Sequence, residues 1–272
     1  MRLWVLLSAL PLLGGDDVNP IIQRLIEAQN QNDERAQQYT YTEETERFAF
    51  DKQGNARKTE AETHEVIFVE GIKYKKLVAR NGKPLSAREK AQVEKDMRLT
   101  AEERRTHQTP LPAGGIISFS GRFSQRSLVL GSLRELLTLY DNKLSGEEAV
   151  RGHQAWIIES TPRQGYTPAS EHEREVLVFS KKFWVDQRDG VLVRAVYTIA
   201  SEDSMFRPGS TLTFEYEKVD EETWEPVSLT LNFSHSKEEE FKPTARTVYI
   251  MSGFKKFDVH STITVMQPGA EK

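Results

Sequence analysis

The sequence of 272 residues contains no cysteine, which excludes disulfide bonds, thiolate metal sites, cysteine nucleophiles and lipidation on a cysteine of this chain. It also lacks the Gly-x-Gly-x-x-Gly fingerprint, the phosphate-binding loop and the Gly-x-Ser-x-Gly elbow. The formal net charge of −4 is small, so composition does not favour nucleic acid as a partner. With these classes set aside, architecture becomes the main guide to function.

The chain has six histidines, and none of them forms a His-x-His or His-Glu-x-x-His pair. A zinc site therefore has little support, and we expect no metal, no cofactor and no catalytic residue. Acidic pairs at residues 43–44, 220–222 and 238–240 fall at or near turns, where carboxylates are solvated. An enzyme of unrecognised type would need a cleft in which such groups converge.

One long apolar run is present, at the start of the chain. Residues 3–13 read LWVLLSALPLL, follow Arg2 and precede Gly14-Gly15, which is the order of a secretory signal peptide. The run is too short to span a bilayer well. We therefore predict a signal peptide over residues 1–15, cleaved after Gly14 or Gly15. The mature protein should be periplasmic and peripheral to a membrane at most.

Most of the remaining chain alternates polar and apolar residues with a period of two, which predicts strands. At residues 181–199, Asp189-Gly190 separates two such runs and predicts a hairpin inside a large sheet. After this turn, alternation places Val193 and Tyr197 on one face. The other expected strands lie at 39–50, 57–70, 72–79, 144–150, 154–161, 173–185, 210–219, 225–233 and 244–265, the last broken near residue 252.

The count is about ten or eleven strands, and strands do not alternate with helices, so a parallel sheet is not expected. The expected fold class is mainly β (α+β), with a large curved antiparallel sheet in a single domain over residues 16–272. Asn19 and Pro20 begin an amphipathic helix that should pack on the sheet. Residues 84–115 form a charged helical insertion and loop, with a capping box of Ser86 and Glu89. A short helix is expected over residues 132–140.

Four aromatic or glycine-containing motifs follow one another in the second half of the chain. Residues 152–159 read GHQAWIIE, 183–186 read FWVD, 190–194 read GVLVR and 224–227 read WEPV. Together with the exported start and the N-terminal helix, they resemble the LolA/LolB-type outer-membrane lipoprotein carrier superfamily. The resemblance covers roughly residues 19–265 and is best over 152–233. The charged insertion departs from the small carriers, and no single functional residue of the carriers matches a position here.

The resemblance implies an unclosed antiparallel β-barrel around lid helices, with an apolar cavity for acyl chains. It implies a non-enzymatic, carrier-like protein whose partner is a lipid or an acylated lipoprotein. Burial of each CH₂ group contributes about 0.8 kcal/mol, which suits such a ligand. The candidate lining residues come from the shared apolar faces of the strands: Trp156, Ile158, Val193, Tyr197, Leu212, Phe214, Leu229 and Leu231.

Two alternatives remain open from the sequence. The eight candidate residues can instead pack against the helices and leave no usable cavity. The protein would then be an envelope interaction or sensor module that recognises a protein partner through its charged surface and the insertion. Related folds serve as glycolipid binders and envelope-stress sensors, so the resemblance is compatible with both readings.

Overall fold

The computed structural model of the chain describes residues 17–106, 116–121, 124–202, 206–234 and 241–257. The expected signal peptide, the loop that ends the charged insertion and the end of the last expected strand lie outside these residues. Within the described residues, no helix is long and apolar enough to cross a membrane.

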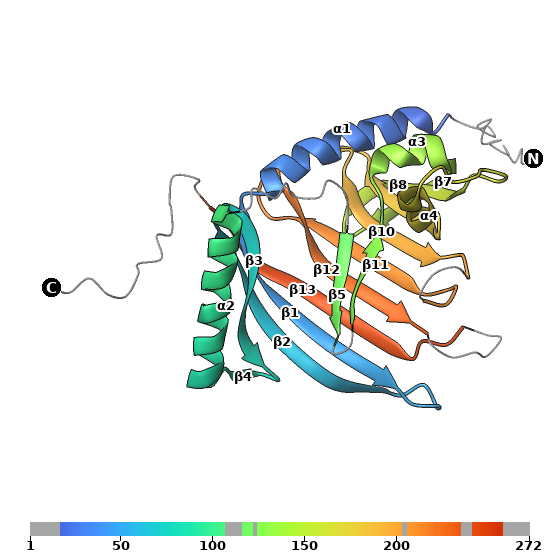
Figure 1. The fold of residues 1–272 in the computed structure, drawn as a ribbon. Helices are drawn as coiled ribbons and strands as arrows, with labels where there is room; N and C mark the ends of the chain where they lie inside the picture. Colours follow the sequence, from blue (N-terminus) through green and yellow to red (C-terminus); the bar gives the residue numbers. More distant parts are fainter. Residues whose placement is uncertain (1–16, 107–115, 122–123, 203–205, 235–240, 258–272) are drawn as a thin grey trace, which may run out of the picture.

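One antiparallel sheet of eleven strands forms the body of the molecule and does not close into a barrel (Figure 1). The strand order is β4-β3-β2-β1-β13-β12-β11-β10-β9-β8-β7, so two meanders join where β1 pairs with β13. The expected fold class is therefore confirmed. The first meander comprises β1 (Tyr39–Phe50), β2 (Ala56–Val69), β3 (Ile72–Arg80) and β4 (Lys83–Pro84). The second comprises β7 (Tyr140–Val150), β8 (His153–Pro162), β9 (Phe179–Asp186), β10 (Leu192–Ile199), β11 (Thr211–Lys218), β12 (Trp224–Phe233) and β13 (Ala245–Lys256).

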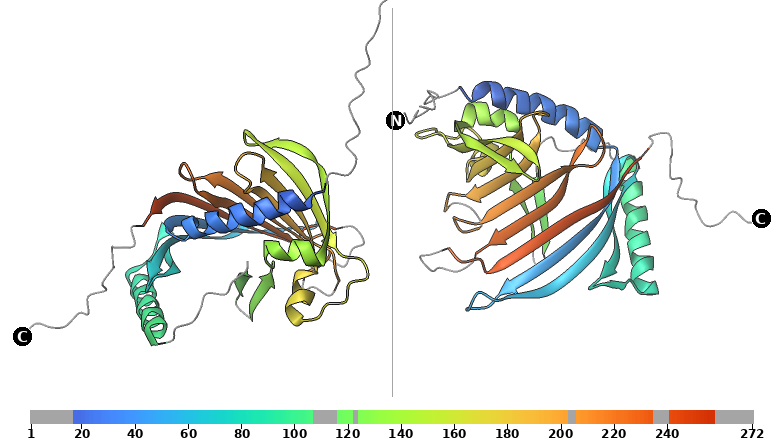
Figure 2. Two further views of the ribbon diagram at one scale, coloured as in Figure 1. Left: turned by 90° about the horizontal axis from the view of Figure 1, so that it is seen from above. Right: turned by 180° about the vertical axis from the view of Figure 1, so that it is seen from behind.

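The sheet is strongly curved, and several smaller elements lie in the hollow of its curve (Figure 2). These are the 3-10 turn η1 (Leu133–Glu135), helices α3 (Leu136–Leu139) and α4 (Glu171–Val176), and the hairpin of β5 (Ile116–Gly121) and β6 (Ser124–Val129). Helix α1 (Asn19–Ala36) crosses one end of the strands, as Figure 1 shows. The concave face is therefore the covered face of the sheet.

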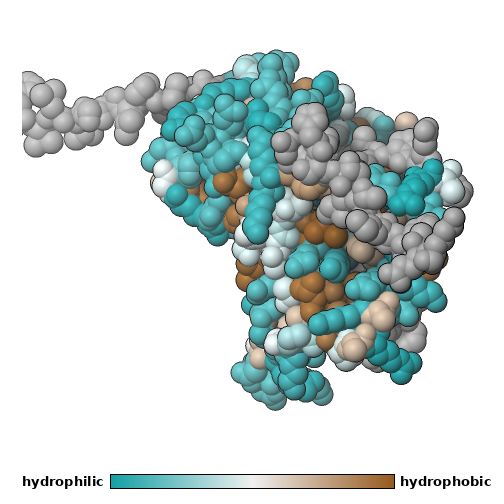
Figure 3. All heavy atoms as spheres, turned by 90° about the vertical axis from the view of Figure 1, so that its left-hand side faces the viewer, coloured by the Kyte–Doolittle hydropathy of each residue, from teal (hydrophilic) through white to brown (hydrophobic). Residues whose placement is uncertain are grey.

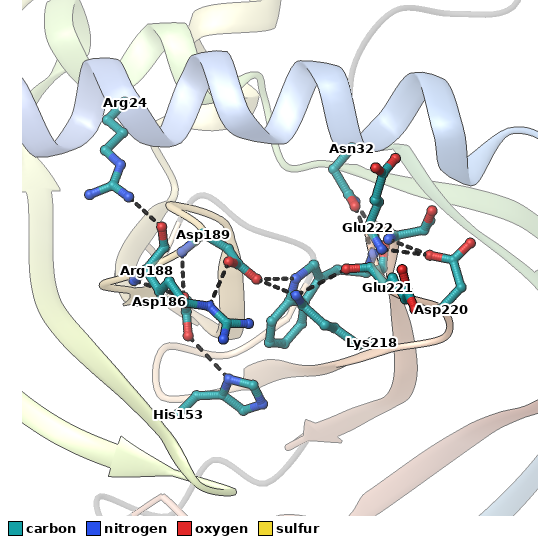
Figure 4. A network of polar contacts seen from close by, with 12 residues as sticks. Arg24, Asn32, His153, Asp186, Arg188, Asp189, Lys218, Asp220, Glu221 and Glu222 are labelled. Atoms are coloured by element: carbon teal, nitrogen blue, oxygen red, sulfur yellow. Dashed lines mark hydrogen bonds and ion pairs between the residues drawn. The ribbon is translucent and has the colours of Figure 1, made fainter.

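Helix α1 is fixed to the turns at the ends of two hairpins (Figure 4). Arg24 donates a hydrogen bond of 2.6 Å to the carbonyl oxygen of Arg188, in the β9–β10 turn. The Asn32 side chain donates to the carbonyl oxygen of Trp224 at 2.8 Å and accepts from its N–H at 2.7 Å. Because Trp224 follows the β11–β12 turn, α1 holds both hairpins from the same side.

The β9–β10 turn is built for this close approach. Asp186 accepts hydrogen bonds from the N–H groups of Arg188 and Asp189 at 2.9 and 2.6 Å. Gly190 has a φ of 74°, which suits glycine, and a Cβ atom there would lie 3.0 Å from the Nε atom of Arg24. The Asp-Gly signal in the sequence thus marks both a hairpin turn and the contact with α1.

Helix α2 (Ala87–Thr106) stands at the β3–β4 edge of the sheet. Its capping box is as expected, since the Ser86 N–H donates to Glu89 at 2.9 Å. At its other end, Arg104 donates to the carbonyl oxygens of Val69 and Ile72, both at 2.9 Å. Seen from this side, the molecule is mostly hydrophilic, with hydrophobic groups gathered in a few patches (Figure 3).

Three local expectations differ from the structure. Residues 173–176 belong to α4 and not to a strand, because Ser170 caps this helix by accepting a hydrogen bond from the Glu173 N–H. β13 runs unbroken past residue 252, where a register shift against β1 replaces the expected break. The β5–β6 hairpin was not expected. Helix α1 begins at Asn19 as predicted. The backbone N–H of Asn19 donates a hydrogen bond to the side chain of Asp17.

Candidate functional site

A cavity of about 930 Å³ lies on the concave face, between α1, residues 130–136 and the strands β9 to β12. Its sheet wall is largely apolar and aromatic, and contains Phe183, Leu192, Tyr197, Phe214, Tyr216 and Pro226. Its volume is within the range of pockets that enclose small organic ligands. The apolar sheet wall suits an aliphatic chain, whereas α1 and residues 130–136 contribute polar side chains to the lining.

The cavity borders a large cluster of buried hydrophobic side chains, which we call the concave cluster. Its fully buried members come from the sheet, from α1 and from the small helices; they include Ile22, Leu25, Leu136, Val176, Phe179, Phe183, Leu212 and Leu231. Tyr197 makes edge-to-face contacts with Phe183 and Phe214, with ring centroids 5.7 and 5.9 Å apart. The aromatic rings of this wall therefore pack against one another.

Most of the eight candidate lining residues predicted from the sequence lie at or near this cavity. Tyr197 and Phe214 line the cavity directly. Ile158, Leu212 and Leu231 are fully buried in the concave cluster, and Trp156 and Leu229 pack against it. The structure therefore brings seven of the eight residues to one face. Their role in holding a ligand stays a prediction.

Val193 is the exception among the eight. It is the extra residue of a bulge in β10, because its neighbours Leu192 and Arg194 pair with consecutive residues of β9. Leu192 belongs to the concave cluster, whereas Val193 belongs to a second buried cluster with Trp184 and Trp224, which we call the outer cluster. The expectation that Val193 shares a face with Tyr197 is wrong, since the bulge shifts the alternation by one residue.

Lys181 is a charged residue in the wall of this cavity that the sequence analysis missed. It is 4% exposed and lies on β9 opposite Tyr197 of β10. Its Nζ atom donates to the carbonyl oxygen of Leu130 at 3.0 Å and lies 4.4 Å from the centre of the Tyr140 ring. Burial lowers the pKa of Lys181 to about 8, against a smaller opposite effect of Glu135.

The opposite wall is formed by residues 130–136. Glu135 accepts hydrogen bonds from the Ser132 N–H and from His172, both at 2.6 Å, and so holds the start of η1 against α4. Gly131 has a φ of 74°, and a Cβ atom there would lie 2.8 Å from the side chain of Val176. This wall therefore needs glycine at residue 131 to approach α4 so closely.

The other half of the concave face is polar. Along β1, β2 and β3, charged side chains pair across the strands in place of an apolar core. Glu43, which is 5% exposed, accepts hydrogen bonds from Lys75 at 2.7 and 2.8 Å. Arg47 lies 2.9 Å from Glu60 and 3.5 Å from Glu62. This ladder satisfies its own charges and offers little surface to an aliphatic chain.

Glu225 lies where the two halves meet, near the end of α1. It is 4% exposed, its Oε1 atom lacks a hydrogen bond within the described part of the chain, and this atom is 4.0 Å from the Lys73 ammonium. Burial raises the pKa of Glu225 to about 7, although Lys73 acts in the opposite direction. Lys73 also donates to the carbonyl oxygen of Ala36 at 3.1 Å, at the end of α1.

A second groove, of about 950 Å³, runs along the edge strand β7. Its lining is mainly polar and includes Asp141, Asn142, Lys143, Glu147 and Arg163. It is less suited to an apolar ligand than the cavity on the concave face. Among the described residues, no three histidine, aspartate and glutamate side chains gather as metal ligands would.

No model of a protein family matches the sequence, and no curated protein matches it. Similar solved structures include a DUF1329 family protein from Desulfovibrio piger, 17% identical, with a TM-score of 0.40 over 91% of this chain and 95% of that chain. A lipoprotein-sorting protein domain from Vibrio parahaemolyticus is 10% identical, with a TM-score of 0.42 over 89% and 95%. A LolA superfamily protein from Nitrosomonas europaea is 12% identical, with a TM-score of 0.38 over 90% and 95%.

One of these structures belongs to the LolA superfamily, which the sequence motifs also resemble. At this level of similarity the likeness concerns the fold alone. What the chain binds has to be argued from its own cavity.

Proposed function

We propose that this protein is an exported, carrier-like binder of a lipid or of a lipoprotein acyl chain, and that it acts without catalysing a reaction. The observation that supports this proposal is the cavity of about 930 Å³ with its wall of Phe183, Tyr197 and Phe214. Such a wall favours an aliphatic chain as its ligand, because burial of apolar surface stabilises the complex and needs no directional hydrogen bonds.

The size of this effect is sufficient. At about 0.8 kcal/mol per buried CH₂ group, a twelve-carbon chain gains on the order of 9 kcal/mol before the costs of association. At the low end of their range, about 4 kcal/mol, those costs leave about 5 kcal/mol, which corresponds to reversible binding with a dissociation constant of roughly 0.1–0.2 mM. Reversible binding is what a carrier requires, since it has to release its cargo.

Export to the periplasm is the second part of the proposal. It rests on the order of residues 1–15, in which a basic start, an apolar run and two glycines follow one another. An acyl chain that crosses the aqueous compartment between two membranes has to be shielded from water, which a binding protein can do. Purification of the mature protein from a periplasmic fraction, with its N-terminus determined, tests this part.

The binding proposal is tested by native mass spectrometry and organic extraction of the mature protein purified from a bacterial periplasm. We expect a phospholipid, glycolipid or acylated peptide to co-purify and to be lost on delipidation. The delipidated protein should then take up a fluorescent acyl probe. Two variants should weaken that uptake at least about tenfold: Phe214→Asp, which places a charge in the wall, and Asn30→Trp, which fills the cavity from the exposed face of α1.

Ile250→Asp is the matched control, because Ile250 is 44% exposed and follows Tyr249, which packs against the concave cluster, so that it points to the opposite face of β13. Its probe uptake should equal that of the wild type. A clean apo mass together with no probe uptake would contradict the proposal. The chain would then be studied as an envelope interaction module, by cross-linking to its partners.

A further inference from the structure

The cavity wall contains one feature that an aliphatic chain alone does not explain, which is the ammonium group of Lys181. The Lys181 side chain comes from the middle of β9, between Phe179 and Phe183, both of which are fully buried. Lysine is almost never fully buried without a partner, because removing its charge from water is strongly unfavourable. A lysine at this position in the strand therefore calls for a partner.

Within the described residues, the partners of Lys181 satisfy it only in part. Its hydrogen bond to the Leu130 carbonyl oxygen, at 3.0 Å, uses one of three N–H donors. The rings of Tyr140 and Tyr197, at 4.4 and 5.7 Å, offer their faces to the charge but accept no ordinary hydrogen bond. No carboxylate of the described chain forms an ion pair with this ammonium.

The two carboxylates that line the same cavity already have partners of their own. Glu135 is held by the Ser132 N–H and by His172. Asp33 accepts a hydrogen bond of 2.8 Å from Gln29 on the same helix. Arg134 and His172 add two more basic side chains to the lining. Within the described residues, His172 therefore has its acceptor in Glu135, whereas the Lys181 ammonium keeps N–H donors that no carboxylate of the cavity accepts.

We propose that the ligand of this cavity is an anionic amphiphile, whose carboxylate or phosphate head group pairs with the Lys181 ammonium while its acyl chain lies against Phe183, Tyr197 and Phe214. This inference rests on the proposed function and narrows it to one chemical class of ligand. An anionic oxygen supplies the acceptor that the ammonium lacks, and its charge offsets the cost of burying Lys181.

The test compares three ligands of equal chain length: laurate, dodecyl phosphate and the neutral 1-dodecanol. Each is measured on the delipidated wild-type protein by displacement of a fluorescent acyl probe. A hydrogen bond to a charged group contributes about 1.5–3 kcal/mol, so at least one anion should bind about ten- to a hundredfold more tightly than dodecanol. The stronger of the two anions identifies the head group as carboxylate or phosphate.

Lys181→Met is the decisive variant, because methionine keeps the length of the side chain and removes the charge. It should abolish the preference for the anions and leave dodecanol binding within about twofold of the wild type. Lys182→Met is the matched control. Lys182 is the next residue of β9, points to the other face and pairs with Glu159 at 2.9 Å. It should retain the full preference.

The possible failures are distinguishable. If all three ligands bind the wild type equally, the head-group proposal is wrong and the binding of acyl chains stands. If none of them binds, both proposals fall. If Lys181→Met and Lys182→Met behave alike while the wild type prefers anions, another group holds the head group and the assignment to Lys181 is wrong.

Discussion

The two halves of the concave face differ in chemistry although they belong to one continuous sheet. The β8–β12 half is lined by fully buried side chains such as Phe183 and Leu231, and α1, α3 and α4 cover it. The half made of β1, β2 and β3 carries a ladder of ion pairs, in which Glu43 pairs with Lys75 and Arg47 with Glu60. We call them the apolar half and the polar half. Curvature alone therefore does not make an apolar cavity, because the apolar lining and the helical cover occur together on one half only.

The largest effect is expected from truncation of the apolar half. Phe183→Ala should lower the free energy of unfolding by about 3–5 kcal/mol, because Phe183 is fully buried and the cavity left behind can close only partly. It should also abolish uptake of the acyl probe. Chemical denaturation and probe titration are the measurements. A loss below 1 kcal/mol would show that the apolar half is not the structural core.

Glu225, at the boundary between the two halves, should make the free energy of unfolding depend on pH. Burial raises its pKa from 4.5 to about 7, so the native protein holds a proton that the unfolded chain releases between these values. The wild type should therefore lose stability as the pH rises from about 4.5 to 7, by on the order of 3 kcal/mol, and then level off.

Glu225→Gln should remove this dependence, because glutamine does not titrate. Denaturant unfolding at pH 4.5 and pH 8 measures the free energy of unfolding of both proteins. Relative to the wild type, the variant should be more stable at pH 8 than at pH 4.5. Parallel pH profiles for the two proteins would mean that Glu225 is ionised as easily in the fold as in water.

Lys181 should give a pH effect of similar size and opposite sign. Burial lowers its pKa from 10.5 to about 8, so between these values the native state binds fewer protons than the unfolded chain. The wild type should gain stability from this group as the pH rises from 8 to 10.5, whereas below pH 8 the full cost of the buried charge is present.

Lys181→Met should therefore be more stable than the ligand-free wild type at pH 7. The expected gain is about 1 kcal/mol, because the Leu130 carbonyl oxygen loses its donor and this loss opposes the gain. The gain should shrink above pH 8. Thermal unfolding across this range, with Lys182→Met as the control, is the measurement; a variant less stable than the wild type at pH 7 would contradict the account.

The smallest effect is expected in the polar half. Arg47→Ala should cost less than about 1 kcal/mol, since the Arg47 and Glu60 side chains are 34% and 46% exposed and exposed ion pairs contribute little. The cost should fall further in 1 M salt, which screens such pairs. Acyl-probe binding should not change. A cost near that of Phe183→Ala would remove the distinction between the halves.

The sequence predicted strands well where alternation was regular. The hairpin at Asp189-Gly190 and the capping box at Ser86 follow from local chemistry, because each depends on residues only a few positions apart. Seven of the eight candidate residues belong to the concave cluster or pack against it, because regular alternation along each strand places them on one face. Val193 does not, because a bulge depends on pairing with β9 and leaves no mark in the alternation of β10 alone.

Lys181 could have been found from the sequence. In the run 179–185 it holds a position that alternation otherwise gives to Phe179, Phe183 and Val185, so a charge stands on the apolar face. The expected strand began six residues too early, at Glu173, and this hid the pattern. Glu225 is different: its burial depends on the end of α1 and on Lys73, which lie far away in the chain.

The most direct test of the division between the halves is paramagnetic broadening by a nitroxide-labelled fatty acid bound to the delipidated protein with ¹³C-labelled methyl groups. We predict strong broadening of the Leu192 methyl signals, because Leu192 lines the cavity, and little at Leu77, which lies on β3 in the polar half. The diamagnetic reduced label serves as the reference. Equal broadening at Leu192 and Leu77, or broadening at Leu77 alone, would contradict the account.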